Sequence, residues 1–493
     1  MNDIRELETL LQARTPVVAV ESHEENKLLA MMERFASLND RTLFVWSVSN
    51  GLRSRNSADS IYNTVEIGQA LRHVEGSPQD AIYVFLDAHP FLDDPLVVRI
   101  IKNISQKAEM VRRMLVFLSH KLVLPAEISH LAAKFTPSLP DSAAIQKILN
   151  EEAANYRATT GDKVGASREA LHMLVQHLQG LTEEDARRLA RMAIRDDGAI
   201  TLADIGRVLK TKHESLQASD VLTLEPGIPD INELGGLDNL KRWLKVRREV
   251  FLSSDATNPL PAPKGVLLLG VQGAGKSLAA KCVAGAWHVP LFRMDFGTLY
   301  QKYHGETERN MREALRVAGA MAPCVLWMDE IEKGIAGDSG GDSDGGVSRR
   351  VLGTLLTWMA ERNSRVFIVA TANDISSLPP ELLRKGRFDE IFFVDLPKAP
   401  ARQDILSLHL KRRKLDPSKF DLAALAGACE GFSGAEIEQA IVSALYEAHA
   451  GKVPLATAHV AGELSRTRSI SVVMAEKIAA LRAWAAERAV QAD

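Results

Sequence analysis

The eight residues Gly270-Val271-Gln272-Gly273-Ala274-Gly275-Lys276-Ser277 constrain the fold more than any other feature of this sequence. They fit the pattern GxxxxGK[ST] and follow the apolar run of residues 265–269, as a loop follows a strand. In such a loop, consecutive backbone N–H groups close around a phosphate, and the positive end of the next helix faces the same anion. The residues expected at the phosphates are Gly270, Gly273, Ala274, Gly275, Lys276 and Ser277. Lys276 would neutralise phosphate oxygens and Ser277 would bind Mg²⁺, so the stretch predicts a nucleoside triphosphate site.

Length and composition indicate several globular domains. The chain has 493 residues, which suggests about three domains. Its 46% apolar and 25% charged residues are typical of globular proteins. A net charge of −3 gives no overall attraction to nucleic acid. The cysteines, Cys282, Cys324 and Cys429, lie far apart in apolar stretches, which favours buried reduced thiols over a disulfide or zinc site.

The N-terminal segment lacks the features of a targeting sequence. Residues 1–7 carry acids where a signal peptide has a basic and then an apolar region. No apolar run approaches the ~18 residues needed to span a bilayer. We therefore expect a cytoplasmic protein without a membrane span.

Strand-like apolar runs alternate with helical stretches, which predicts an α/β fold with mostly parallel sheets. In the second half, short apolar runs predict strands of one central sheet at residues 266–269, 291–294, 324–328, 366–370 and 391–394. Proline and glycine in residues 224–230 break any helix. Residues 216–236 are therefore interpreted as a linker between two α/β halves.

The two halves resemble each other. Residues 81–87 end a strand-like run in an acid, as residues 324–330 do, and residues 114–119 match 366–371 in character and order. Two further pairs of segments follow in the same order, 138–149 with 395–406 and 180–185 with 431–436. The order favours an internal duplication, although any α/β domain shares some of this pattern.

The first copy has lost the phosphate chemistry. Residues 21–27 contain no glycine that would let the backbone approach phosphate, and they carry three carboxylates that would repel it. Asp87 is followed by Ala88, so a second acid is missing. Residues 1–215 are predicted to form a non-hydrolysing scaffold or docking domain.

Three polar residues downstream of the loop complete a hydrolytic arrangement. Asp329 and Glu330 close a predicted strand, where Asp329 would hold Mg²⁺ and Glu330 would orient or deprotonate a water. Asn373 follows the next strand and can donate and accept hydrogen bonds toward a γ-phosphate or the water. Taken alone, the two acids are equally compatible with a surface turn, and an isolated Asn373 is more typical of a turn than of a site.

Residues 378–389, taken with the loop, Asp329, Glu330 and Asn373, resemble the AAA family of ring-forming ATPases. The resemblance implies that Arg384 and Arg387 reach into the nucleotide site of a neighbouring subunit. Guanidinium groups placed there neutralise charge on the transferring phosphoryl oxygens. A degenerate module before an active one is most similar to AAA proteins encoded by conserved open reading frames of plastids and cyanobacteria and by bacterial relatives.

The resemblance also implies a domain division and further nucleotide contacts. It predicts a P-loop AAA module with a parallel sheet flanked by helices at residues 237–398, a helical lid at residues 399–493, and a degenerate AAA-like α/β domain before them. Gly236 would lie beside the adenine, and Gly434 and Ala435 would pack near the base and ribose. The cofactors implied are ATP and Mg²⁺.

Two segments occupy the positions of the family's pore loops. Tyr303 would project into a central channel and grip an extended polypeptide, or it would be a buried tyrosine with a local partner. Residues 337–346 contain only glycine, serine and aspartate, which suits a polypeptide in the channel and equally a solvated loop.

These features predict an Mg²⁺-dependent ATPase that assembles as a homo-hexameric ring. The ring would remodel or thread a protein client recognised by residues 1–215, while nucleic acid is a weaker alternative. A different class of function, an ATP-switched regulatory scaffold without threading, stays open. Glu332-Lys333 departs from the acid-plus-apolar pair common in the family.

Overall fold

The computed structural model describes residues 2–55, 59–107, 111–195, 198–215, 221–253, 259–299, 306–335, 347–384 and 386–493. The chain folds as two compact units. Unit 1 comprises Met1–Ile148 and Leu181–Arg188, and unit 2 comprises Leu149–Gly180 and Leu189–Asp493. Within these described ranges, no helix is long and apolar enough to cross a membrane.

Unit 1 is built on a six-stranded sheet with the order β3-β2-β4-β5-β1-β6. All pairs are parallel except β2 with β3. The strands are β1 (Val17–Glu21), β2 (Thr42–Ser47), β3 (Gly51–Ser54), β4 (Ala81–Leu86), β5 (Met114–Ser119) and β6 (Ala132–Phe135). The helices that accompany them are α1 (Asn2–Gln12), α2 (Glu25–Leu38), α3 (Ile67–Gly76), the 3₁₀ turn η1 (His89–Phe91), α4 (Pro95–Gln106) and α5 (Ala126–Ser129).

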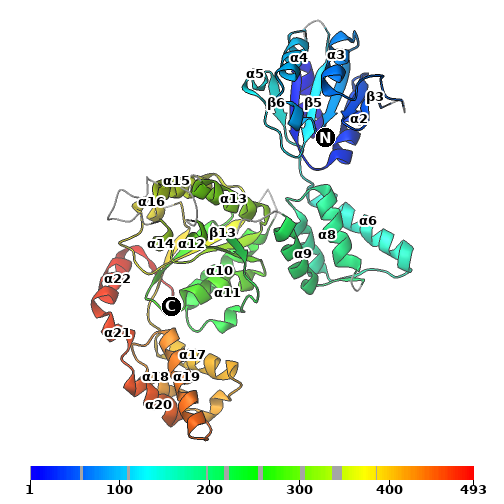
Figure 1. The fold of residues 1–493 in the computed structure, drawn as a ribbon. Coiled ribbons are helices and arrows are strands. Elements are labelled where there is room, and N and C mark those ends of the chain that lie inside the picture. Colours follow the sequence, from blue (N-terminus) through cyan, green and yellow to red (C-terminus); the bar gives the residue numbers. More distant parts are fainter. Residues whose placement is uncertain are drawn as a thin grey trace. The chain divides into compact units, whose positions relative to one another are not determined.

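Helices cover both faces of this sheet, as Figure 1 shows in blue and cyan. Along β1, Val17 and Ala19 pack into one core with residues of α3 and α4, while Val18 and Val20 pack into the other with residues of α1 and α2. Because both faces are buried, the central strands are continuous apolar runs rather than alternating ones.

The chain continues through a helical segment into the second sheet. This segment contains α6 (Ser142–Thr160), α7 (Arg168–Leu178), α8 (Glu183–Arg195) and α9 (Leu202–Ser215), with the short pair β7 (Gly165–Ala166) and β8 (Ala199–Ile200). The second sheet has seven strands in the order β15-β14-β10-β13-β12-β11-β9. They are β9 (Leu222–Leu224), β10 (Gly265–Gly270), β11 (Leu291–Met294), β12 (Cys324–Met328), β13 (Val366–Ala372), β14 (Glu390–Val394) and β15 (Val490–Gln491).

The five strands predicted for the second half are β10 to β14, and they are parallel neighbours in one sheet. The stretch interpreted as a linker also contributes to this sheet. Its strand β9 pairs antiparallel with β11, and Leu224 lies opposite Phe292. Backbone pairing therefore anchors part of residues 216–236 to the sheet edge.

Helices flank the second sheet and extend beyond it. Those around the sheet are η2 (Ile231–Glu233), α10 (Asp238–Leu252), α11 (Lys276–Trp287), α12 (Phe296–Leu299), α13 (Glu306–Ala320), α14 (Ile331–Ile335), α15 (Val347–Glu361) and α16 (Pro380–Leu383). The C-terminal helices are α17 (Ala399–Arg412), η4 (Pro417–Lys419), α18 (Leu422–Ala428), α19 (Gly434–Ala450), α20 (Thr457–Arg466), α21 (Ile470–Val473) and α22 (Ala475–Arg488). Helices α17 to α20 share a separate apolar core, drawn in orange and red in Figure 1.

The two sheets share one topology. In unit 1 the parallel strands lie in the order β6-β1-β5-β4-β2, and in unit 2 the first five lie in the order β14-β10-β13-β12-β11, with the short strand β15 added parallel to β14. When these five parallel strands are numbered in chain order, their order across each sheet is the same, 5-1-4-3-2. Each sheet also adds an antiparallel edge strand next to its second parallel strand. The internal resemblance seen in the sequence is thus confirmed at the level of strand order.

The three cysteines are buried and not disulfide-bonded, as the sequence predicts. Burial raises the pKa of the Cys282 and Cys324 thiols to about 12. They are therefore protonated, unreactive core residues.

Candidate functional site

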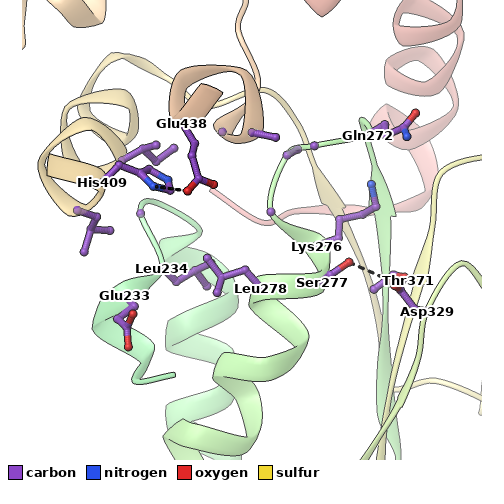
Figure 2. A pocket seen from close by; sticks show the side chains of 18 of the residues that line it. Glu233, Leu234, Gln272, Lys276, Ser277, Leu278, Asp329, Thr371, His409 and Glu438 are labelled. Atoms are coloured by element: carbon purple, nitrogen blue, oxygen red, sulfur yellow. Dashed lines mark hydrogen bonds and ion pairs between the residues drawn. The ribbon is translucent and has the colours of Figure 1, made fainter. Parts of the chain in front are cut away.

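A cavity of about 410 Å³ opens at the carboxyl ends of β10, β12 and β13 in unit 2 (Figure 2). This size suits a nucleotide-sized ligand. The lining residues come from the loop after β10, from the ends of β12 and β13, from the η2 region and from the lid helices. They are Glu233, Leu234, Gly235, Gln272, Gly273, Ala274, Gly275, Lys276, Ser277, Leu278, Asp329, Glu330, Thr371, Asn373, Ile405, Leu408, His409, Arg412, Gly434, Ala435 and Glu438.

The loop between β10 and α11 follows the course that its glycines permit. A Cβ on Gly270 would lie 2.0 Å from the carbonyl oxygen of Val394 on the neighbouring strand, so a larger residue would push β10 and β14 apart. Gly273 and Gly275 have φ values of 77° and 95°, in the left-handed region that favours glycine. Helix α11 begins directly at Lys276, so its unpaired N–H groups lie beside the loop. The loop and helix together form an anion site.

Lys276 is buried at the base of this loop. Its Nζ donates to the carbonyl oxygens of Gly270, at 2.9 Å, and of Val271, at 2.8 Å. Burial lowers the pKa of Lys276 to about 8, while nearby carboxylates, Glu332 first among them, act in the opposite direction. A phosphate at the loop would stabilise the ammonium form.

The hydroxyl and carboxylate expected to hold a cation lie together. Ser277 Oγ donates to Asp329 Oδ1 over 3.1 Å, and Thr371 Oγ1 donates to the same oxygen over 2.7 Å. Thr371 also accepts the backbone N–H of Glu330. Oxygen ligands of this kind are those that Mg²⁺ prefers, so the residues present fit that ion.

Glu330 and Asn373 meet beside this pair. Asn373 Nδ2 donates to Glu330 Oε1 over 2.9 Å. Lys333 Nζ binds the other oxygen, Oε2, at 2.5 Å. Glu332 is buried, and burial raises its pKa. Its Oε1 accepts the backbone N–H of Asn373 over 2.8 Å, which fixes the residue that contacts Glu330.

The opposite end of the cavity, next to the lid helices, combines apolar and charged side chains (Figure 2). Leu234 and Leu278 face this end, where His409 Nδ1 lies 3.3 Å from Glu438 Oε1. Burial lowers the pKa of His409, although Glu438 opposes the shift. The His409 ring and the leucines at this end can contact a flat heterocycle.

The lid is attached to the phosphate loop by backbone contacts. The N–H of Ala435 donates to the carbonyl oxygen of Gly273 over 3.2 Å. A Cβ on Gly273 would lie 2.9 Å from Ser433 Oγ, so the absence of a side chain lets the two segments approach. Because of these contacts, a movement of the lid would also displace the phosphate loop.

Most of the predicted site residues line this one cavity. These are Gly273, Ala274, Gly275, Lys276, Ser277, Asp329, Glu330, Asn373, Gly434 and Ala435. Gly270 contributes through its carbonyl oxygen, and Gly236 lines an adjacent cavity while its neighbour Gly235 lines this one. Tyr303 and residues 337–346 lie outside the described residues.

The two arginines expected to reach the nucleotide of a neighbouring subunit lie outside this cavity. Among the residues that the structure describes, neither Arg384 nor Arg387 lines the cavity of its own chain. Arg384 is exposed at the end of α16, and Arg387 donates to the carbonyl oxygen of Leu356 over 2.6 Å.

Sequence reasoning missed four residues that shape the site: Thr371, Glu332, His409 and Glu438. Thr371 lies two positions before Asn373, and Glu332 lies two positions after Glu330. His409 and Glu438 lie 29 positions apart on two lid helices and become partners only through the packing of α17 on α19. Their residue types and spacing carry no local pattern that could have identified them.

Family models match three parts of the chain. Residues 3–136 match the N-terminal domain of SpoVK-like AAA ATPases, and residues 143–219 match the second domain of these proteins. Residues 266–396 match the ATPase family associated with various cellular activities, AAA.

Relatives extend over nearly the whole chain. The AAA domain-containing protein ycf46 of Pyropia yezoensis is 32% identical over 99% of this chain and 98% of its own length. Its counterpart in Guillardia theta is 33% identical over 98% of this chain and 95% of its own length. The proteasome-activating nucleotidase of Aeropyrum pernix is 30% identical over 66% of this chain and 79% of its own length. The chain therefore belongs to the AAA family of ATPases, whose activity is the hydrolysis of ATP.

Proposed function

We propose that this chain hydrolyses ATP at the interfaces of a homo-hexameric ring and uses the energy to remodel or thread a protein client. The observation that carries the proposal is the placement of the arginines. The cavity holds the lysine, the acids and the asparagine of a hydrolytic site, whereas Arg384 is exposed outside it. A neighbouring subunit can supply an arginine to the phosphate end of the cavity.

We assign the roles within the site as follows. Lys276 and the backbone of residues 270–277 bind the phosphates, and Ser277 with Asp329 holds Mg²⁺, which when bound neutralises phosphate charge. Glu330 orients or deprotonates the attacking water, and Asn373 fixes the Glu330 carboxylate through the 2.9 Å bond. The leucines and His409 at the opposite end contact the base.

A mixing experiment tests whether the arginines act in trans. Arg384→Ala and Lys276→Ala should each reduce ATP hydrolysis about 10³-fold, by removing the arginine or the phosphate lysine. In a 1:1 mixture, about one interface in four combines an intact lysine with an intact arginine from the neighbour, because each is present with a probability of about one half. We expect about a quarter of wild-type turnover.

Each variant measured alone at the same total concentration is the matched control. Co-purification through two different affinity tags establishes that mixed rings form. Mixed rings that stay as inactive as the single variants would show that Arg384 acts within its own chain.

We propose that Tyr303 grips the client in the channel and that residues 1–215 recognise it. Tyr303→Ala should keep ATP hydrolysis and lose client processing. Tyr303→Phe, which keeps the aromatic side chain, should retain both. The client for this assay is first captured by Glu330→Gln, which should bind ATP without hydrolysing it. Client processing that survives in Tyr303→Ala would favour the ATP-switched scaffold. The cytoplasmic location expected from the sequence stays a prediction.

A further inference from the structure

Unit 1 carries a hydroxyl–carboxylate pair at the position that corresponds to Thr371 and the cation ligand Asp329 in unit 2. Asp87 directly follows β4, the third parallel strand, as Asp329 follows β12. The register places Ser119 on β5 beside Asp87, as Thr371 on β13 lies beside Asp329. Ser119 Oγ donates to Asp87 Oδ1 over 3.2 Å, and Thr371 makes the same bond to Asp329 over 2.7 Å. The duplicated sheet has kept this part of the site.

The phosphate part has not been kept. In unit 1, Glu21 is the strand partner of Ser119 and the last residue of β1. In unit 2, Leu268 is the strand partner of Thr371, and β10 continues for two more residues. The chain after β1 has no glycine before Gly51, and Glu21 is bound to Lys134 and to the N–H of Leu122. This edge of unit 1 therefore offers no cradle for a nucleotide.

Two histidines join Asp87 at this edge. His89 begins the turn η1, and His120 follows β5. One ligand atom from each of Asp87, His89 and His120 lies within 4.8 Å of the others. A metal bound at about 2.0–2.2 Å from each atom fits this grouping after small side-chain rotations.

The side chains are held in place by residues around them. Ser119 Oγ lies 2.6 Å from His89 Nδ1 as well as 3.2 Å from Asp87 Oδ1, so one hydroxyl orients two of the three groups. That bond leaves Nε2 of His89 for a ligand. His23 stacks on His120 with ring centroids 6.0 Å apart. Metal-binding histidines characteristically make a hydrogen bond through the ring nitrogen that does not bind the metal, as His89 does with Ser119.

We propose that Asp87, His89 and His120 bind one divalent transition-metal ion, for which Zn²⁺ is the probe. Two imidazoles and one carboxylate suit zinc and its neighbours in the first transition series, and they disfavour magnesium, which prefers oxygen. Three protein ligands leave a coordination position for water or for a group from a partner. A solvent-accessible edge gives the ion a path in, since Asp87 and His120 are exposed.

Titration of the full chain with zinc tests the proposal. The protein is stripped with chelator, freed of any histidine tag and nucleotide, and titrated with ZnCl₂ by calorimetry, with the bound metal counted after dialysis. Wild type should bind one zinc ion per chain, and the double variant His89→Ala/His120→Ala should not bind it. Asp87→Asn, which tolerates the positive φ of residue 87, should weaken binding, and Ser119→Ala should weaken it about tenfold.

The matched control is His73→Ala, an exposed histidine on α3 of the same unit, which should bind zinc as wild type does. Circular dichroism of each variant establishes that the fold is intact. Cobalt adds a second readout, because its visible absorption should report nitrogen ligands in wild type and lose them in the double variant. The proposal is wrong if the double variant binds zinc like wild type, which would place the ion at Ser277 and Asp329 or elsewhere, or if wild type binds none at about 100 µM zinc.

Discussion

At the scale of single residues, Lys276 should make nucleotide binding depend on pH. Burial holds its pKa at about 8, so the free protein loses this positive charge as the pH rises through that value. Since bound phosphate favours the ammonium form, affinity for ATP should be constant below about pH 7 and fall by up to about tenfold per pH unit above 8. The dissociation constant of Mg²⁺–ATP between pH 7 and 9.5 measures this.

Lys276→Arg is the control for this prediction. Arginine stays protonated throughout the range, so the variant should bind more weakly but with a flat pH profile. An equal pH dependence in wild type and variant would mean that another group is responsible.

At the scale of elements, a buried lysine joins α9 to the end of α7 within unit 2. Lys212 is fully buried, and its Nζ donates to the carbonyl oxygens of His177, at 2.7 Å, and Gln179, at 2.8 Å. These carbonyls lie at the C-terminal end of α7, which attracts positive charge. The contact holds α9 against the C-terminal end of α7.

The same lysine should make the stability of unit 2 depend on pH. Burial lowers the pKa of Lys212 to about 7, below the value of about 10.4 in an unfolded chain. Between these values the unfolded state binds the additional proton, so stability should rise with pH from about 7, by at most about 1.4 kcal/mol per pH unit. Urea unfolding at pH 7, 8 and 9 measures this slope.

Lys212→Met should remove the rise, because methionine fills a similar volume without titrating. Lys210→Met, on the exposed side of the same helix, should leave it unchanged. A wild-type slope that persists in Lys212→Met would assign the effect to other groups.

At the scale of the whole molecule, an active site completed by a neighbour links activity to assembly. On the proposed function, specific ATPase activity should fall toward zero when the protein is diluted below the dissociation constant of the ring. Turnover per subunit, measured across a thousandfold dilution beside the mass from light scattering, should follow the oligomer fraction. Constant turnover in monomeric protein would contradict shared sites.

The fold was largely predictable because its strands are short, fully apolar runs ended by polar residues. Residues 324–328 and 366–370 are recognisable in this way without any knowledge of their neighbours. Strand β9 was not, since Leu222–Leu224 is short and lies among helix-breaking residues, and it is ordered by pairing with β11. A pattern within the chain cannot indicate a strand whose stability comes from its partner.

Local sequence patterns identify the phosphate loop, the acids after β12 and Asn373 after β13. Each is a local pattern in which backbone geometry and residue type fix the chemistry, and parallel strands bring their carboxyl ends to one edge. Which side chains contact one another across that edge depends on the tertiary structure. The bonds of Thr371 to Asp329, of Glu332 to the backbone of Asn373, and of Ser119 to Asp87 and His89 join residues 30 to 42 positions apart. Such contacts depend on strand register and helix packing, which are set by the burial of apolar faces throughout the unit.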